Sequence, residues 1–437
     1  MVRLELALRP AAGPPGWPVP GGSGPVPPRL RRFDPRRGTL LALSVAVATA
    51  VAVLAAQLVT LNTGASAHGS TEISAIGPTL EAGENPLYAI RDVLDRQSAA
   101  LLHGDRDGYL RAIPAQQQEL RAQAGQRFES LTALHVRRWT MTTWGVPSLV
   151  NGVWEEPVDL GYCFGASDCT PINLRIDTSW TVVHRRLQLV AYEQTNRPWD
   201  GSRLTVKDGS RVTVAGPVSG AVLDQVLHAA EDAAGTADRF ATSFDGPPER
   251  YFVYVAGKSQ WQRWYDGGGA NAAAYTRALQ PGASDVVIDR REVTSDVETT
   301  TILTHEFGHV VTLDGTRPPV DTWWLIEGMA EYIANGDGSA LRDDLPSVHK
   351  YLKEGRWDGT VALGPPPTDA SLEDTVARYG IALLAVTYLA RHYGEAKALE
   401  FFARMVRRQA TLQAASRSVF GEDWSAVSKH TAASIRG

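Results

Sequence analysis

The sequence predicts an α+β protein with two folded domains behind a long N-terminal segment. The chain has 437 residues, more than one compact core usually contains. Apolar residues recur at helical spacing over residues 87–122, whereas residues 180–214 contain strand-forming patterns. A new helical pattern begins at residue 221, after the sequence GPVSG. Helices followed by a run of antiparallel strands are typical of the α+β class.

The first 61 residues are predicted to form a basic tail and a membrane anchor. Residues 1–39 are rich in Pro and Gly, which predicts disorder, and carry seven Arg against two acidic residues. Residues 40–61 contain no charge, and a helix of that length, at about 1.5 Å per residue, spans the roughly 30 Å hydrocarbon layer. No Lys or Arg follows until Arg91, so the positive-inside rule places the N-terminus in the cytoplasm and the remainder outside the cell.

Cleavage is an alternative to a retained anchor. Residues 65–67, Ala-Ser-Ala, resemble a signal-peptidase site, and cleavage near Ala67 would give a secreted protein. The apolar run is longer than the core of a usual signal peptide, which favours the anchor. Residues 62–87 are predicted to be a linker. Outside the cell Cys163 and Cys169 could form a disulfide, and the sequence leaves open whether they do.

The charge of the folded part argues against a nucleic-acid partner. The formal net charge of the chain is −5, but residues 1–61 hold seven basic and two acidic side chains. The remainder therefore has 36 basic and 46 acidic side chains, a net charge of −10. This acidic excess lacks the basic footprint of a nucleic-acid or anionic-membrane surface.

Residues 88–216 are predicted to form the first domain. One helix should end near Gly104, a second should cover residues 107–122, and Asp208-Gly209 should supply the positive φ of a tight hairpin over residues 203–214. This order of helices and strands resembles the cystatin-like cone of nuclear-transport-factor-2-like domains, at the level of fold alone. Such a cone holds a ligand or acts as a spacer. The sequence names no partner for it.

A candidate metal site lies in the sequence THEFGHVV, residues 304–311. On a helix His305 and His309 stand one turn apart on the same face, so both imidazoles can reach one zinc ion. Glu306 is displaced by about 100° around the helix and can instead act as a general base toward a water molecule. A capping box that begins at Ser295 predicts the start of this helix.

A catalytic zinc site needs a third protein ligand and an open position. The metzincin pattern, which continues with Gly and His, is absent, since the chain reads VVTLDG after His309. A new helix is predicted at WWLIEGMAEY, residues 323–332, where Glu327 lies 18 residues beyond His309 and Glu331 lies one turn further on.

The pattern His-Glu-x-x-His followed by Trp-Leu-x-Glu-Gly-x-Ala-Glu resembles the gluzincin metallopeptidases, specifically the peptidase-MA-like family related to aminopeptidase N. The resemblance covers about residues 221–405, and we expect the second domain to comprise residues 221–437. It implies a thermolysin-like fold, with a small mixed sheet and a mostly helical lower half. By this match Zn²⁺ is the cofactor, Glu327 is the third ligand, and Glu331 holds a ligand histidine by its far nitrogen.

The resemblance also implies further parts of an active site. Tyr379 matches a tyrosine that points at the oxyanion position, although an ordinary core tyrosine is the alternative. The sequence SDVVID, residues 284–289, is expected at a sheet edge that binds extended substrate, unless it is an internal strand. The family's glutamate that captures a free amine is absent from GGGANAAAYTRA, residues 267–278, so aminopeptidase activity does not carry over.

The expected function is therefore that of a membrane-anchored extracellular zinc metallopeptidase that hydrolyses peptide bonds. Zinc would acidify a water molecule, Glu306 would accept its proton, and the same carboxyl group would pass the proton to the leaving amine. Two alternatives remain: a non-catalytic zinc-holding binding or scaffold protein, and a zinc hydrolase of a non-peptide substrate. An intact Glu306 speaks against the former.

Overall fold

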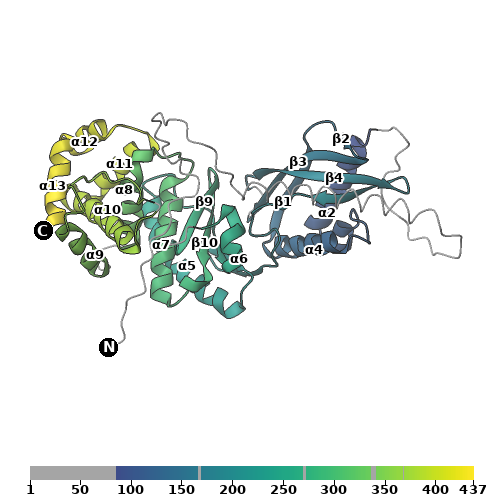
Figure 1. Cartoon of the computed structure of the whole chain (residues 1–437), viewed down its shortest axis with the longest axis horizontal. Coiled ribbons are helices and arrows are strands. Elements are labelled where there is room, and N and C mark those ends of the chain that lie inside the picture. The colour runs from purple at the N-terminus through teal and green to yellow at the C-terminus, as the bar shows by residue number, and fades with distance from the viewer. Residues whose placement is uncertain (1–84, 166–168, 269–271, 336–340, 368) are drawn as a thin grey trace, which may run out of the picture.

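The predicted α+β class is confirmed by the computed structural model (Figure 1). The structure describes residues 85–437, with gaps at 166–168, 269–271, 336–340 and 368. The predicted tail (1–39), anchor (40–61) and nearly all of the linker lie outside the described residues. Within the described part of the chain, no helix combines the length and the hydropathy needed to cross a membrane.

The first half begins with three helices, which are α2 (Leu87–Leu102), α3 (Arg106–Leu110) and α4 (Gln118–Ala133). The predicted helix over residues 107–122 is wrong, because the chain breaks after α3 and resumes helical geometry only at Gln118. Pro114 accounts for the break: it has no backbone N–H and disfavours helical geometry in the preceding residue. Asp105 caps α3 by accepting a hydrogen bond from the backbone of Gly108.

An antiparallel sheet follows, in the order β1-β3-β4-β5 with β2 paired to β3. Its strands are β1 (Val136–Thr143), β2 (Ser148–Val150), β3 (Val153–Phe164), β4 (Ile172–Val183) and β5 (Arg186–Tyr192). A two-residue turn joins β4 to β5, and both of its residues, His184 and Arg185, have positive φ. Neither is a glycine, so the usual sequence signal for this turn is missing.

A second, mixed sheet has the order β6-β7-β8-β10-β9. Its strands are β6 (Thr205–Asp208), β7 (Val212–Gly216), β8 (Tyr251–Ala256), β9 (Ala274–Gln280) and β10 (Ala283–Asp289). The predicted hairpin exists as β6–β7, but β7 pairs in parallel with β8, so the hairpin belongs to this sheet and not to a domain that ends at residue 216. Gly209 has no positive φ, because the connection is longer than a two-residue turn.

The expectation that residues 284–289 form a sheet edge is wrong. β10 lies between β8, its parallel neighbour, and β9, its antiparallel neighbour. The edge strand is β9, for which the sequence analysis predicted no strand. Pro281 and Gly282 make the β9–β10 turn, where Gly282 has a φ of 80° that favours glycine.

Helices α5 (Gly220–Ala241) and α7 (Asp296–Leu313) cover one face of the mixed sheet (Figure 1). Ser295 caps α7 as predicted, since its hydroxyl accepts a hydrogen bond from the backbone of Glu298, and the Glu298 carboxylate accepts a bond from the Ser295 hydroxyl. The C-terminal half is helical and has its own apolar core. Its helices are α8 (Trp323–Asn335), α9 (Leu341–Lys353), α10 (Leu372–Tyr393), α11 (Glu395–Phe402), α12 (Leu412–Phe420) and α13 (Trp424–Arg436).

The two sheets share one hydrophobic core. Buried residues of the first sheet, such as Trp139 and Trp180, belong to the same cluster as Tyr254 and Val287 of the mixed sheet. The short helix α6 (Lys258–Arg263) packs against this core through Trp261.

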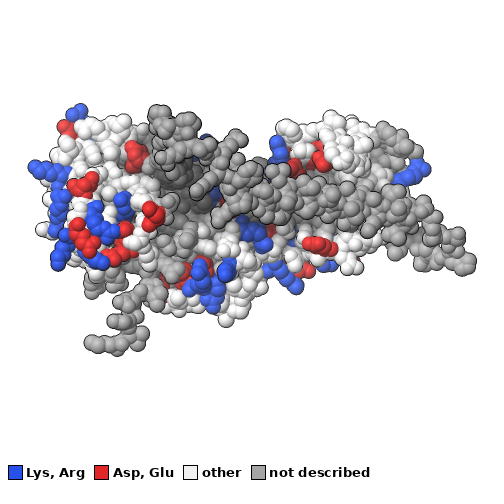
Figure 2. Space-filling model, viewed as in Figure 1, with Lys and Arg blue, Asp and Glu red and all other residues white. Residues whose placement is uncertain are grey.

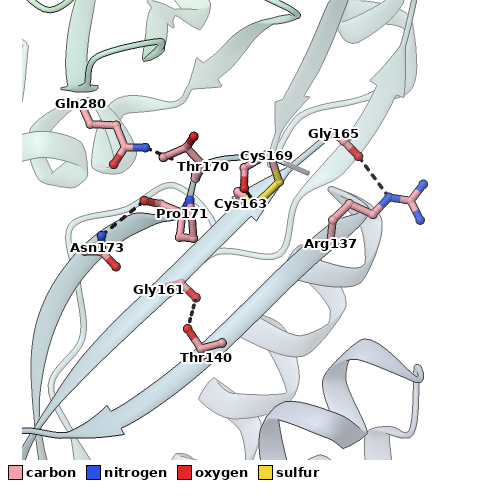
Figure 3. Close-up of a disulfide and its surroundings, with 10 residues drawn as sticks. All are labelled: Arg137, Thr140, Gly161, Cys163, Gly165, Cys169, Thr170, Pro171, Asn173 and Gln280. Carbon is pink, nitrogen blue, oxygen red and sulfur yellow. Dashed lines mark hydrogen bonds between the residues drawn. A yellow bond between two sulfur atoms is a disulfide. The ribbon is translucent and has the colours of Figure 1, made fainter. Parts of the chain in front are cut away.

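A disulfide lies close to the junction of the two sheets. Cys163 at the end of β3 is bonded to Cys169 (Figure 3), so the sequence's open question about these cysteines is resolved. Beside the bridge, Gln280 of β9 donates a hydrogen bond to the carbonyl oxygen of Thr170. The loop that the disulfide closes at the end of β3 is therefore connected to the edge strand of the second sheet through this hydrogen bond.

Candidate metal centre

Three predicted ligand atoms converge at the contact between α7 and α8. Nε2 of His305 lies 3.1 Å from Nε2 of His309, and each nitrogen lies 3.4 Å from Oε2 of Glu327. A tetrahedral zinc ion at about 2.0–2.1 Å from each ligand requires ligand–ligand separations of about 3.3 Å. The side chains thus form a triangle of the size that zinc ligation needs. They are the one group with metal-ligand spacing in the described chain.

The chemistry of the triangle fits a cation. All three side chains are buried, and neither carboxylate oxygen of Glu327 accepts a hydrogen bond from any described residue. Burial disfavours the ionised form of Glu327. The positive charges of His309 and His305 outweigh burial and lower the pKa of Glu327 to about 2. A buried carboxylate in contact with two imidazole nitrogens needs a positive charge among them, which a bound cation or a protonated histidine can supply.

Glu331 lies behind the triangle and contacts one of its members. Its Oε1 is 3.1 Å from Nδ1 of His305, on the side of the ring opposite Nε2. The side chain of Asn335 donates a hydrogen bond of 3.1 Å to the other oxygen of Glu331. Burial opposes a charge on His305, but Glu331 outweighs it and raises the pKa of the imidazole well above its usual value. Glu331 is therefore placed to fix the orientation of His305 so that Nε2 faces the triangle.

Glu306 is held on the edge strand β9 by one of its two carboxylate oxygens. The hydroxyl of Thr276, on β9, donates a hydrogen bond of 2.6 Å to Oε2 of Glu306, while Oε1 has no partner among the described residues. Burial raises the pKa of Glu306, and the nearby charges of His305 and His309 act in the opposite direction. One oxygen is thus fixed and the other is free to accept a proton, which is the arrangement that a general base needs.

Tyr379 of α10 lies beside His305. Its ring centroid is 6.4 Å from that of His305 and 5.1 Å from that of Trp323, and the residue is buried. Burial, together with the carboxylates of Glu327 and Glu331, raises the pKa of Tyr379 well above its usual value. The phenol therefore keeps its proton at neutral pH and remains a hydrogen-bond donor.

Two glycines set the distances between these helices. A Cβ at Gly308 of α7 would meet Cα of Ala330 at 3.3 Å, and a Cβ at Gly328 of α8 would meet the carbonyl oxygen of Ala382 on α10 at 2.4 Å. The glycines in the two motifs thus let α8 lie close to its neighbours on both sides. This packing brings Glu327 to the histidines and the helix that carries Tyr379 to the same place.

Thr276 is the site residue that the sequence did not reveal. It lies 30 residues before Glu306, on a strand that was not predicted. The signal that could have found β9 is the Pro281-Gly282 dipeptide between two apolar-rich stretches, a pattern typical of a hairpin. A comparison of the chain with models of protein families found no match, and neither did a comparison with curated proteins.

Proposed function

We propose that this chain is a zinc metallopeptidase, anchored in the membrane by residues 40–61, whose folded part hydrolyses peptide bonds outside the cell. The observation that carries the proposal is the buried triangle of His305, His309 and Glu327, with Glu306 directly beside it. The resemblance of both motifs to gluzincins points to the same activity. We further propose that the second half has the thermolysin-like fold and the first half the cone-like fold that the sequence suggested.

Zn²⁺ is the metal that the donor set favours, because two imidazoles and a carboxylate are typical of catalytic zinc sites. Bound there, the ion would supply a Lewis acid and acidify a water molecule. Glu306 would accept the proton of that water through its free oxygen and later pass it to the leaving amine. The Tyr379 hydroxyl would donate a hydrogen bond to the developing oxyanion.

The edge strand β9 is the proposed binding surface for the peptide backbone. β10 occupies one side of β9, and no other strand of the described chain pairs with its second side. An extended substrate could therefore add to the sheet through main-chain hydrogen bonds. Because Thr276 and Glu306 are hydrogen-bonded, a peptide on this strand would run past the proposed base. The missing amine-capturing glutamate leaves endopeptidase action as open as exopeptidase action.

The proposal is tested by cleavage of an unfolded protein by the full chain in detergent, with zinc content measured on the same sample. We expect wild type to cut and to hold about one zinc per chain, as a single three-ligand site implies. Glu306→Gln should keep the zinc and lose at least about a hundredfold in rate, since a general base contributes about 10²–10⁴-fold. His305→Ala should lose both.

Other outcomes separate the alternatives. Zinc without cleavage of any peptide substrate would favour the binding or scaffold protein. Zinc with hydrolysis of ester or amide model compounds, but not of peptides, would favour a hydrolase of another substrate class. Equal cleavage by wild type and Glu306→Gln would show that the activity comes from a different site or from a contaminant.

A further inference from the structure

Exposed apolar side chains gather at one end of the first sheet. Of the ten large hydrophobic side chains that are exposed in the described chain, four lie within residues 144–150, at and beside β2. Together with Tyr88 of α2 they form what we call the apolar tip: Tyr88, Trp144, Val146, Leu149 and Val150. The visible surface over β2 is drawn mostly white in Figure 2, with some charged groups over β3, whereas charged groups of both signs mix over the helical half.

The loop that carries the apolar tip is held in place. The backbone N–H of Trp144 donates to the carbonyl oxygen of Pro157, and that of Gly145 donates to the buried carboxylate of Glu156. Pro147 is buried between its exposed neighbours. The backbone is thus fixed, and the apolar side chains point to solvent. A fixed loop with exposed Trp and Val loses little conformational entropy when a partner covers it.

Charged side chains lie at the rim of the apolar tip. The guanidinium of Arg175 lies 4.2 Å from the centre of the Trp144 ring and forms an ion pair of 2.9 Å with Asp159. Glu155 is exposed on the neighbouring stretch of β3. An apolar patch with a Trp, a Tyr and an Arg at its rim resembles the belts that proteins place at a membrane–water interface, where the charges would block deep burial.

The apolar tip also lies next to the point where the described chain begins. The Arg91 side chain, in the first turns of α2, donates a hydrogen bond of 2.7 Å to the hydroxyl of Thr143, the residue before Trp144. Tyr88 lies three residues before Arg91 and therefore on the same side of α2. The segment from the proposed anchor to Asn85 has only 23 residues. The apolar tip is thus the part of the folded protein that meets the tether.

We propose that the apolar tip rests in the interfacial layer of the bilayer that holds the anchor. The proposal rests on the anchored topology of the proposed function, but not on the metal centre. A tethered surface meets the membrane at high effective concentration, so a few partly buried side chains suffice for contact. The helices that form the metal centre and the sheet that carries the apolar tip lie at different places along the long axis of the molecule (Figure 1). Contact of the apolar tip with the bilayer would therefore hold the metal centre away from the lipid.

The test places an environment-sensitive fluorophore on the full chain in phosphatidylcholine vesicles. Because the native cysteines are bridged, Val146→Cys introduces the single free thiol. Val297→Cys, at the start of α7, is the matched control, since the two valines are 72% and 77% exposed. With a quencher on the lipid headgroup, we expect the probe at 146 to shift to the blue and lose about half its emission, as contact at headgroup depth implies. The probe at 297 should change little.

Flotation of the same vesicles shows whether the chain is bound to them. It therefore separates the proposal of a membrane anchor from the proposal that the apolar tip contacts the bilayer. Quenching at 146 but not at 297, lost again in Trp144→Asp, supports the apolar tip as a membrane contact. Flotation without quenching at 146 overturns it and leaves the anchor standing. A chain that does not float overturns the anchor and the apolar tip together, while zinc-dependent cleavage is still measurable in detergent. A blue shift that needs no lipid and grows with protein concentration overturns the proposal in favour of a second copy.

Discussion

The hydroxyl of Thr276 donates a hydrogen bond to Oε2 of Glu306 across 2.6 Å and so connects the edge strand β9 with the helix that carries both histidines. We expect Thr276→Val to lower kcat about tenfold, since a hydrogen bond to a charged group contributes about 1.5–3 kcal/mol. The bond stabilises the ionised carboxylate, so its loss should raise the pKa of Glu306 further. The acid limb of the pH–rate profile should then move to higher pH.

Thr276→Ser is the matched control, because it keeps the hydroxyl and removes a methyl group. It should restore both the rate and the position of the acid limb. A purely structural role for Thr276 would change the melting temperature of both variants without moving the limb. Equal profiles for Val and Ser would therefore contradict a role in orienting Glu306.

Glu331 should control how many protons leave when zinc binds. Glu331, together with Glu327, raises the pKa of His305 well above its usual value, which favours the protonated imidazole in the metal-free chain, and that proton must leave before the nitrogen coordinates. We expect about one proton to be released per zinc bound, measured by titration calorimetry in buffers of different ionisation enthalpy. In Glu331→Gln the raised pKa falls and the release at pH 7 should shrink. Unchanged release would mean that Glu331 does not act on His305.

Metal removal should destabilise the folded chain. A zinc ion present at a thousand times its Kd stabilises the folded state by about 4 kcal/mol, and chelation removes this contribution. We expect the melting temperature to fall by several degrees with a chelator and to recover with zinc but not with magnesium, which prefers oxygen ligands. His309→Ala should melt at the lower temperature and respond to neither. A wild-type chain indifferent to the chelator would contradict a metal centre.

Gly328 should tolerate no side chain. A Cβ there would lie 2.4 Å from the Ala382 carbonyl oxygen, so Gly328→Ala has to push α8 and α10 apart. We expect a loss of about 1–3 kcal/mol in the free energy of unfolding and a fall in zinc content. Gly235, inside α5, is the control, because its added Cβ meets nothing within 4 Å. Gly235→Ala should stabilise the chain by up to about 1 kcal/mol. Denaturant titration of both variants measures the contrast.

Asp285 should make stability depend on pH at the junction of the two sheets. Burial raises the pKa of Asp285 to about 6, against a hydrogen bond from Tyr265 and the charge of Arg197. The folded state therefore binds this proton more tightly than the unfolded chain does, and its stabilising contribution is lost as the pH rises from about 4 to about 6.

An Asp285→Asn variant removes this titration and keeps an acceptor for Tyr265. The free energy of unfolding of the variant minus that of wild type should grow by up to about 3 kcal/mol between pH 4 and pH 7, since each pKa unit is worth about 1.4 kcal/mol. Urea titrations at both pH values give this difference. A difference independent of pH would mean that Asp285 stays ionised throughout.

Local rules were enough to predict much of the candidate site. His305 and His309 share a face because of helical periodicity, and the apolar pattern around Glu327 predicted the helix that follows. The contact between α7 and α8 was expected only through the family resemblance. What makes it physically possible, the pair of glycines at 308 and 328, is visible only in the packing.

The failures have more than one cause, and the first is pairing between segments far apart in sequence. The β6–β7 hairpin was assigned to the preceding strands, but its partner is β8, some 35 residues later. β9 was missed because the alanines at 272–274 that lead into it carry little strand propensity, and Thr276 was missed with it. Pro114 shows the opposite case, a local signal that was present in the sequence and breaks the helix that was predicted across it.

The placement of the hairpin decides how the half of the chain that carries the candidate metal centre can be produced in isolation. A recombinant fragment that starts at residue 221 would omit β6 and β7 and uncover the backbone of β8 along the sequence YFVYVA. Such an apolar, uncharged strand with an open edge invites stacking into insoluble aggregates. Because the second sheet also shares its core with the first, expression trials should retain the chain from residue 85 onward.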